Sequence, residues 1–434
     1  MLSSSTSSSH TIAAGDDDKS SSRDLFLLMD GTGRSPESVL MGKRSRTNIQ
    51  ILRDELGGKL VDADLEDGWE IRELQDSRSH SNKRQGLLFY DRGLGSPQLD
   101  NDGQLVKWSL RPSSFFKDPR SVYRRFLEND YFERLTAFGI LDNVAQAYEF
   151  LVRNYRSDHS DRVFLFGFSR GAYTHRLLIQ LIRYFGLVRK ESLEADPDLI
   201  EKAFLLYNGD VHPRDNAAVK AFRAEHCLPG ECHHENLVYF MGLFDTVRGM
   251  VIEKVHEDTR INKVVRIARH ALSLDEQRPT YRPEIWTRNP NLENPDHVQM
   301  WFPGVHSDVG GSYKENSLSN VSLNWMVEEA GLDRDHFRDK YPPDPLGMQH
   351  DSYQRRMHEN WRLTWAMVSM YKTLDRLATV PADADNLQFH LSVSLRAGKT
   401  VSRQGIPYVY PDHVKRFQQI QALQRRLKED SSFA

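Results

Sequence analysis

The residues with the clearest chemical meaning lie at Gly167-Phe-Ser-Arg-Gly171, where a serine stands between two glycines. A serine hydroxyl is a weak nucleophile at neutral pH, so it needs a base within hydrogen-bond reach and a carboxylate that orients this base. Flanking glycines allow a sharp strand-to-helix turn, and the backbone N–H of Arg170 would donate to a developing oxyanion. The pattern predicts that Ser169 is a nucleophile, and a serine that merely caps a helix is the alternative.

Two further residues complete such a site, because each follows an apolar run that is typical of a buried strand. Asp245 ends the run Leu237–Phe244, and His306 lies just past the run Val298–Phe302. Serine, acid and then histidine is the chain order of α/β-hydrolases. We therefore predict a triad of Ser169, Asp245 and His306, in which His306 is the base and Asp245 orients it.

Each partner of the serine has a plainer alternative. Asp245 could cap a turn with Thr246, and His306 could be an ordinary loop histidine among the 17 histidines of the chain. His270 is a reserve base, although we expect it inside a helix, and Asp308 is a reserve acid or an orienting group. The catalytic interpretation is favoured because active sites of parallel sheets lie at strand ends.

A second oxyanion donor is expected in the loop that follows an earlier strand. The apolar run Asp24–Met29 ends in Asp30-Gly-Thr-Gly33, where the N–H of Gly31 or Thr32 would serve. A purely structural turn is an equal alternative here. Asp30 itself is a candidate supporting residue.

Three other motifs are similar to sites of other chemistries but match those sites poorly. Met29-Asp-Gly-Thr32 is similar to a phosphatase-type aspartate turn but lacks the second aspartate two residues on. The glycine-rich turns at 31–33 and 93–95 lack the spacing of a phosphate-binding loop. The third is a group of residues of types that bind metals: His226, Cys227, Cys232, His233 and His234. Their spacing matches no standard zinc site, so a polar loop is favoured over a zinc site. We expect no metal and no cofactor.

The elements that must position these residues are apolar runs that alternate with helical patterns. Runs that are apolar throughout are typical of parallel strands with helices on both faces. We therefore predict an α/β-hydrolase-like fold with a mostly parallel sheet. Five residues converge at the carboxyl ends of its strands: Asp30, Asp91, Ser169, Asp245 and His306.

Periodicity and polarity divide the chain. Residues 1–22 are predicted as a disordered tail, residues 23–330 as the hydrolase core, and residues 331–434 as a helical extension packed on the core. The core has two insertions: a polar segment at about 57–86, predicted as a loop, and a segment of mixed character at about 96–135. Further strands are expected at Gly86–Asp91 and Asp161–Gly167. Helices are expected at Ser45–Leu56, Ile140–Tyr155, Arg170–Phe185, Leu199–Leu206, Ala217–Ala224, Ile261–Leu272, Leu318–Ala330, Asp351–Leu377 and His413–Lys428.

Composition excludes several classes of protein. A net charge of −3, from 58 Lys and Arg against 61 Asp and Glu, gives no basic footprint for nucleic acid and no global attraction to anionic membranes. Two cysteines exclude a disulfide-stapled secreted scaffold and favour a reducing, cytoplasmic location. No apolar stretch reaches the roughly 18 residues of a membrane span, so we expect peripheral membrane contact at most.

Seven short blocks along the chain are more specific than any single motif. They are Asp30-Gly-Thr-Gly33, Thr47-Asn48, Tyr90-Asp91-x-Gly-x-Gly95, Gly167-Phe-Ser-Arg-Gly-Ala-Tyr173, Phe244-Asp-Thr-Val247, His270-Ala-x-x-x-Asp-Glu276 and Trp301-Phe-Pro-Gly-Val-His-Ser-Asp-Val-Gly-Gly311. In this order they resemble the DUF2235 family, with a weaker similarity at His390-Leu-Ser-Val-Ser394. That family is of α/β-hydrolase type and includes the Tle1-type phospholipase effectors of bacterial type VI secretion.

The resemblance implies a triad at Ser169, Asp245 and His306, and hydrolysis of carboxylic esters, with phospholipase A activity in the effector branch. We therefore expect a serine esterase or lipase that acts on an ester or lipid through an acyl-enzyme. A soluble ester or thioester is the alternative substrate. A catalytically silent module that keeps the hydrolase fold for binding or as a scaffold is the alternative function.

Overall fold

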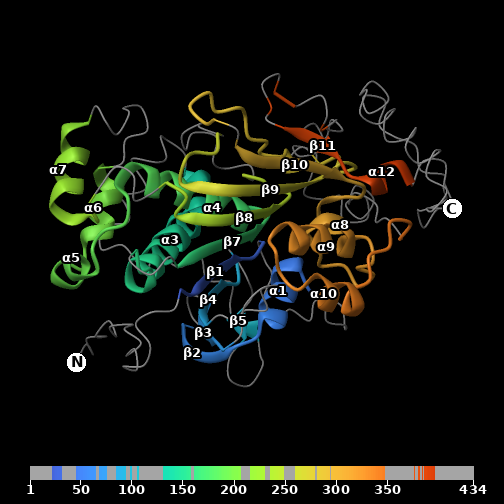
Figure 1. The fold of residues 1–434 in the computed structure, drawn as a ribbon, viewed down its shortest axis with the longest axis horizontal. Coiled ribbons are helices and arrows are strands. Elements are labelled where there is room, and N and C mark those ends of the chain that lie inside the picture. The colour runs from blue at the N-terminus through green and yellow to red at the C-terminus, as the bar shows by residue number, and fades with distance from the viewer. Residues whose placement is uncertain are drawn as a thin grey trace.

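In the computed structural model, nine of the described strands form one sheet (Figure 1). Its strands lie in the order β11 (Leu387–Phe389), β10 (Asp296–Phe302), β9 (Val265–Ser273), β8 (Val238–Phe244), β7 (Arg162–Phe168), β1 (Asp24–Met29), β4 (Gly86–Asp91), β3 (Trp69–Leu74) and β2 (Lys59–Asp64). Two short strands, β5 (Gln98–Leu99) and β6 (Leu105–Val106), form a separate pair. The structure describes residues 22–31, 45–64, 68–75, 85–93, 98–99, 105–106, 131–157, 161–206, 216–229, 235–248, 260–278, 281–293, 295–347, 376, 380–381, 384 and 386–395.

The strands from β11 through β4 pair in parallel, whereas β3 and β2 are added in antiparallel fashion. The chain reverses its direction of growth at β1: β4 lies on one side of it, and β7 lies on the other, followed outward by β8, β9 and β10. In open parallel sheets, ligands bind beyond the carboxyl ends of the strands at such a reversal. Asp30 and Ser169 follow the two strands that meet there.

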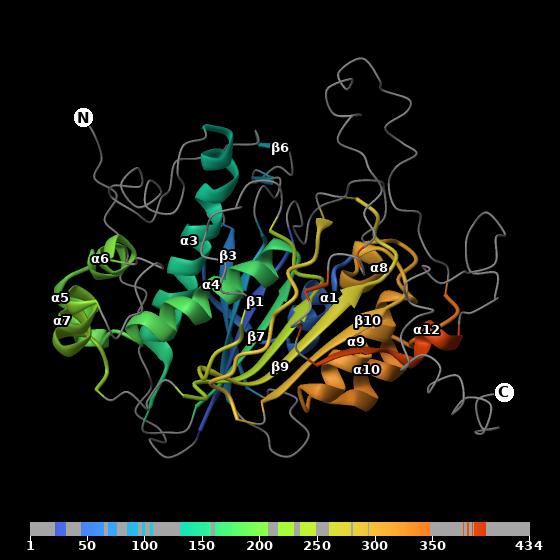
Figure 2. The ribbon, with the colours of Figure 1, turned by 90° about the horizontal axis from the view of Figure 1, so that it is seen from above.

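Helices cover both faces of the sheet (Figure 2). One face carries α3 (Tyr131–Asn154) and α4 (Arg170–Phe185), and the other carries α1 (Asn48–Leu56), α8 (His306–Gly310), α9 (Ser319–Glu329) and α10 (Arg334–Lys340). Side chains of a strand alternate between the two faces. Leu25 and Leu27 accordingly join one buried cluster, and Phe26 and Leu28 join the other. The predicted α/β fold with helices on both faces is confirmed.

The remaining described helices lie at the ends of these layers. They are α5 (Lys190–Ala195), α6 (Leu199–Leu206), α7 (Ala217–His226) and α12 (Leu391–Leu395). The helices predicted at 199–206 and 318–330 are found within one residue of their expected bounds, and that at 140–155 begins earlier, at Tyr131. The predicted tail up to residue 21, the helix at 413–428 and nearly all of that at 351–377 lie outside the described residues. The division into core and C-terminal extension stays a prediction.

Two predictions about local structure are wrong. The insertion at 57–86 is not a loop throughout, because β2 and β3 form an antiparallel hairpin there that extends the sheet beyond β4. Its polar residues suit a sheet edge, where one strand has no further neighbour. The segment 261–272 is not a helix, because it forms β9. Short apolar runs are ambiguous between the two periods, and Val264, Val265 and Ile267 are β-branched, which favours a strand.

Candidate active site

Ser169 lies on the turn between β7 and α4, with a backbone φ of 58°. Residues other than glycine rarely adopt a positive φ, and such strain persists only where surrounding contacts hold it. The flanking glycines allow those contacts. A Cβ atom on Gly171 would lie 2.2 Å from the carbonyl oxygen of Met29, and one on Gly167 would lie 2.6 Å from the Cα of Ala172. Both positions therefore need glycine if α4 is to start this close to β1.

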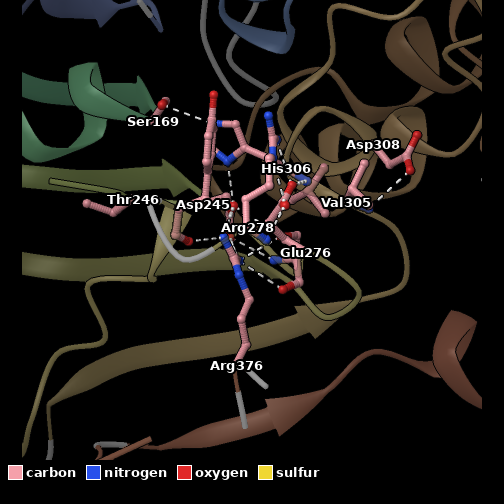
Figure 3. A network of polar contacts seen from close by, with 12 residues as sticks. Ser169, Asp245, Thr246, Glu276, Arg278, Val305, His306, Asp308 and Arg376 are labelled. Atoms are coloured by element: carbon pink, nitrogen blue, oxygen red, sulfur yellow. Dashed lines mark hydrogen bonds and ion pairs between the residues drawn. The ribbon is translucent and has the colours of Figure 1, made fainter. Parts of the chain in front are cut away.

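The Ser169 side chain faces His306 rather than its own helix (Figure 3). Its hydroxyl makes no capping hydrogen bond to α4, unlike that of a capping serine. Ser169 Oγ lies 2.9 Å from His306 Nε2, and His306 Nδ1 lies 2.5 Å from Asp245 Oδ2. All three side chains are buried. The fold thus brings residues from three separate strand ends into one hydrogen-bonded line.

His306 begins helix α8, and several contacts hold it in place. Its ring packs against the rings of Phe168 and Tyr281, with centroids 4.6 Å and 4.8 Å away. The helix itself is tied to α1, because the side-chain amide of Asn48 donates to the carbonyl of Val309 at 2.9 Å. These contacts fix the orientation of an imidazole that must reach Ser169 on one side and a carboxylate on the other.

Asp245 directly follows β8 and has a positive φ of 42°, and donors from separate parts of the chain surround its carboxylate. Ser273, at the end of β9, donates its N–H to Oδ1 at 2.8 Å and its hydroxyl to Oδ2 at 3.1 Å. Arg376 donates to Oδ1 at 2.6 Å and to Oδ2 at 3.0 Å. Both oxygens of the carboxylate that contacts His306 therefore accept hydrogen bonds from Ser273 and from Arg376.

Burial and these hydrogen-bond partners set the charge states of Asp245 and His306. Burial alone would raise the pKa of the Asp245 carboxyl, but Arg376 and His306 outweigh it and hold that pKa well below its usual range. Burial lowers the pKa of His306 and outweighs the opposing effect of Asp245. At neutral pH the pair is an ionised carboxylate and a neutral imidazole. A neutral imidazole is the form that can accept the serine proton.

The predicted oxyanion donors have different outcomes. Arg170 is the first residue of α4, so its N–H lies at the helix start next to Ser169. Gly31 packs against the same turn, where an added Cβ would lie 3.3 Å from the Cβ of Ser169. The N–H of Gly31, however, donates to Asp30 Oδ1 at 2.7 Å and so does not point to a substrate oxygen. Thr32 lies outside the described residues.

Asp30 is buried and organises the turn after β1. Its Oδ2 accepts hydrogen bonds from the Thr47 hydroxyl at 2.8 Å and from the Tyr90 hydroxyl at 3.1 Å. Thr47 caps α1 and Tyr90 lies on β4, so one carboxylate joins β1, β4 and α1. This position fits the supporting role that the sequence indicates for Asp30.

The two reserve residues, His270 and Asp308, lie beside the hydrogen-bonded side chains of Ser169, His306 and Asp245 and are not part of that chain of hydrogen bonds. His270 lies on β9, where its Nε2 accepts the N–H of Thr246 at 3.1 Å and its Nδ1 faces Gln299 Oε1 at 3.4 Å. Burial lowers its pKa to about 3, so it is neutral and hydrogen-bonded on both nitrogens. Asp308 accepts the N–H of Val305 at 3.0 Å, which supports the turn immediately before the candidate base.

Three residues around the site were missed by sequence reasoning: Ser273, Glu276 and Arg376. Glu276 is buried, accepts the backbone N–H of His306 at 3.3 Å and pairs with Arg278 at 2.7 Å. Burial opposes its ionisation, but Arg278 outweighs this and lowers the pKa of Glu276 to about 2. Glu276 lies in one of the seven blocks, which was a usable signal. Arg376 lies within the helix predicted at Asp351–Leu377, in a segment without a motif, and nothing local indicates its role.

The possible metal ligands give no site within the described ranges. There, no group of three or more His, Cys, Asp or Glu side chains is arranged to hold a metal ion. Cys227 is buried, and burial raises the pKa of its thiol to about 12, whereas residues 232–234 lie outside these ranges. Among the described helices, none is long and apolar enough to cross a membrane.

Similar proteins were found by sequence and by structure. "Uncharacterized protein YEL023C" of Saccharomyces cerevisiae is 29% identical over 227 residues, which are 51% of this chain and 30% of that protein. A crystal structure of an uncharacterized protein from Pseudomonas aeruginosa aligns with a TM-score of 0.38 at 16% identity, over 75% of this chain and 50% of that one. The Tle1 effector bound to the VgrG spike from the Type 6 secretion system aligns with a TM-score of 0.32 at 15% identity, over 71% of this chain and 56% of that one.

One protein family also matches the sequence over most of the chain. Residues 23–329 match the family described as "T6SS, Phospholipase effector Tle1-like, catalytic domain". This range contains every residue of the hydrogen-bonded line Ser169, His306 and Asp245, and it contains all seven sequence blocks. The chain therefore belongs to the Tle1-like catalytic domain family of type VI secretion phospholipase effectors, a family of lipolytic hydrolases.

Proposed function

We propose that this protein is a serine hydrolase that cleaves carboxylic esters of lipids, with Ser169 as nucleophile, His306 as base and Asp245 as the acid that orients the base. The observation that carries this proposal is the pair of hydrogen bonds of 2.9 Å and 2.5 Å that joins the three side chains. The strained turn at Ser169 supports it, because a sharp strand-to-helix turn of this kind carries the nucleophile of α/β-hydrolases. The phospholipase family supports a lipid ester as substrate.

With these residues, hydrolysis of the ester proceeds in two acyl-transfer steps, first to Ser169 and then to water. In the first, His306 Nε2 takes the hydroxyl proton of Ser169 while Oγ attacks the ester carbonyl carbon. The C–O bond to the alcohol then breaks, and the alcohol leaves with the proton from Nε2. In the second step, His306 takes a proton from water, the resulting hydroxide attacks the acyl carbon, and Ser169 recovers the proton as the acid leaves.

The environment of each group suits its part in these steps. Asp245 stays ionised throughout, because its partners hold its pKa low, and it stabilises the imidazolium that forms transiently. The N–H of Arg170 donates to the tetrahedral oxyanion, aided by the positive end of the α4 dipole. We propose Thr32 as the second donor, since the backbone of Gly31, which precedes it, packs against the turn at Ser169.

A fluorophosphonate probe, which reacts covalently with activated serines, tests the proposal. We expect the native protein to be labelled and Ser169→Ala to stay unlabelled. Ser319→Ala is the matched control, because Ser319 is another buried serine at the start of a helix, and its hydroxyl donates only locally to the carbonyl of Asn316 at 2.9 Å. Absence of labelling in the native protein, or equal labelling of Ser169→Ala, would contradict the proposal and favour a binding or scaffold module.

The lipid part of the proposal needs a separate measurement. Chromogenic esters from acetyl to palmitoyl and phospholipid vesicles would be compared as substrates at equal acyl concentration. We expect release of fatty acid from long-chain esters and from phospholipid, both abolished in Ser169→Ala. Hydrolysis confined to short soluble esters would restrict the function to that of an esterase.

A further inference from the structure

Arg376 connects the carboxylate of Asp245 to two other segments beside the candidate active site (Figure 3). Its Nη1 and Nη2 donate to Asp245 Oδ1 and Oδ2 at 2.6 Å and 3.0 Å. Nη1 also donates to the carbonyl of Ser273 at 2.9 Å, and Nη2 donates to the carbonyl of Tyr281. Both side chains of the ion pair are fully buried. Arg376 lies outside residues 23–329, the range that matches the family.

The geometry of this pair needs an arginine. A guanidinium is a planar fork of donors, so it can grip both oxygens of a carboxylate and still reach neighbouring carbonyls, whereas a lysine ammonium is a point charge. Net stability is a poor reason for burying such a pair, because the cost of removing two charges from water offsets most of their attraction. The effect of the pair on Asp245 is therefore the better place to look for its role.

We propose that Arg376 is a positioning residue that clamps the Asp245 carboxylate, so that Oδ2 faces His306 Nδ1, and that balances its buried charge. This inference rests on the proposed function of the triad. Without the fork, only Ser273 holds the carboxylate on the side away from His306 among the described residues, so the carboxylate rotates more freely about its Cβ–Cγ bond and orients the imidazole less firmly. Small losses of orientation lower catalysis strongly, because the reacting groups must be held in near-attack geometry. The C-terminal part of the chain thereby completes a site that lies in the family domain.

The charges around His306 explain what the arginine adds. Asp245 contacts the imidazole and Glu276 accepts the backbone N–H of the same residue, so two buried carboxylates lie beside it. Arg376 pairs with the first carboxylate and Arg278 with the second, so these charges balance while the imidazole is neutral. Loss of Arg376 leaves excess negative charge, which favours the imidazolium form. The described titratable and charged groups nearest the imidazole are Ser169, Asp245, Glu276, Arg278, Tyr281 and Arg376.

The test is the pH profile of Arg376→Gln, followed both by kcat/KM for a soluble chromogenic ester and by the rate of fluorophosphonate labelling. We expect the plateau of kcat/KM to fall about 10- to 100-fold. We also expect the acid limb of the profile to move by about one pH unit toward higher pH, because the pKa of His306 rises. Arg162→Gln is the matched control, because Arg162 makes an equally bidentate contact to the buried Asp24 at the far end of the sheet. Its acid limb should stay where that of the native protein lies.

Arg376→Lys separates charge from geometry, and it serves if Arg376→Gln is too unstable to isolate. It keeps the positive charge but not the fork, so we expect an unshifted acid limb and a reduced plateau. A plateau equal to that of the native protein in Arg376→Lys, or an unshifted acid limb in Arg376→Gln, would overturn the role of Arg376. A native protein that the probe does not label would instead refute the proposed function, so the two failures are distinguishable.

Discussion

Two aspartate–arginine pairs with fully buried carboxylates lie at opposite ends of the same sheet. Asp24 and Arg162 pair at the amino ends of β1 and β7, through two hydrogen bonds of 2.8 Å. Asp245 and Arg376 pair at the carboxyl end of β8, through hydrogen bonds of 2.6 Å and 3.0 Å. Both are bidentate, and both aspartates are fully buried. Because the pairs are chemically alike, a difference in role has to come from their neighbours.

The neighbours of the two pairs differ in kind. At the amino end, Asp24 and Arg162 face each other across regular strand pairing, so the pair joins two strands. At the carboxyl end, the carboxylate also contacts a histidine that can change its charge, and both Asp245 and Ser169 have a positive φ. The same kind of ion pair therefore joins regular strands at the amino end and, in our proposal, positions a base at the carboxyl end.

The largest expected difference comes from removing one carboxylate charge at each end. We expect Asp245→Asn to lower kcat/KM by about 10⁴-fold, because an amide favours the wrong imidazole tautomer. Asp24→Asn should leave kcat/KM unchanged and lower the free energy of unfolding by about 1–2 kcal/mol, since the partly buried guanidinium of Arg162 loses its charged partner. Ester hydrolysis and chemical denaturation measure the two effects. Equal activities in the two variants would remove the distinction between the ends.

Two glycines provide a second test, because they make the same close approach at opposite ends of β1. A Cβ atom on Gly171 would lie 2.2 Å from the carbonyl oxygen of Met29, and one on Gly86 would lie 2.2 Å from that of Asp24. We expect both alanine variants to lose about 1–3 kcal/mol of stability through overpacking. Only Gly171→Ala should also lower kcat/KM, by about 100-fold, because it displaces the turn that carries Ser169. Similar activity losses in both would point to a general effect of instability.

Acidification should affect the two ends in separate pH windows. The lowered pKa of His306 places the acid limb of kcat/KM below the ordinary value of 6.5, with full activity above it, where the imidazole is neutral. At the amino end, the pKa of Asp161 is lowered: burial opposes the shift, but Arg156 and Arg23 outweigh it. Its contribution to stability is therefore full above its unfolded pKa of 3.8 and is lost as the pH falls through its lower folded value. Parallel pH series of activity and of denaturation would contradict this order if both fell together.

The smallest effect is expected where a carboxylate has two arginine partners. Asp161 pairs with Arg156 at 2.9 Å and with Arg23 at 3.3 Å, and both arginines are partly exposed. Arg156→Gln should therefore cost about 0.5–1 kcal/mol of stability and leave kcat/KM unchanged, because one partner remains. Thermal unfolding and ester hydrolysis check both statements. A larger loss of stability would show that the amino end depends on each of its ion pairs.

Much of the candidate site could be predicted because its signals are local. The apolar runs before Ser169 and Asp245 predict strands, and the glycines at 167 and 171 predict the turn that the structure contains. The sequence could not decide between the N–H groups of Gly31 and Thr32 as the second oxyanion donor, because the choice depends on which acceptor the N–H of Gly31 finds in the fold. That acceptor is Asp30, the residue directly before it, and only the orientation of its side chain decides this.

The errors in the fold have a related cause. Residues 265–273 carry apolar side chains at spacings that suit both a helix and a strand, and pairing with β8 and β10 decides for the strand. Residues 59–64 and 69–74 lack the continuous apolar run of a buried parallel strand, yet they pair in antiparallel fashion beside β4. Neighbouring strands supply the deciding hydrogen bonds in both segments, and a local pattern does not contain them.

The class of the fold and the sharp turn at Ser169 follow from the sequence, because apolar periodicity and glycines act over short distances. The pairing of Arg376 with Asp245 follows from the tertiary structure alone, since the two residues lie 131 positions apart and no motif joins them. The physical reason is that a buried carboxylate requires charge and hydrogen-bond partners, and the fold alone determines which part of the chain provides them.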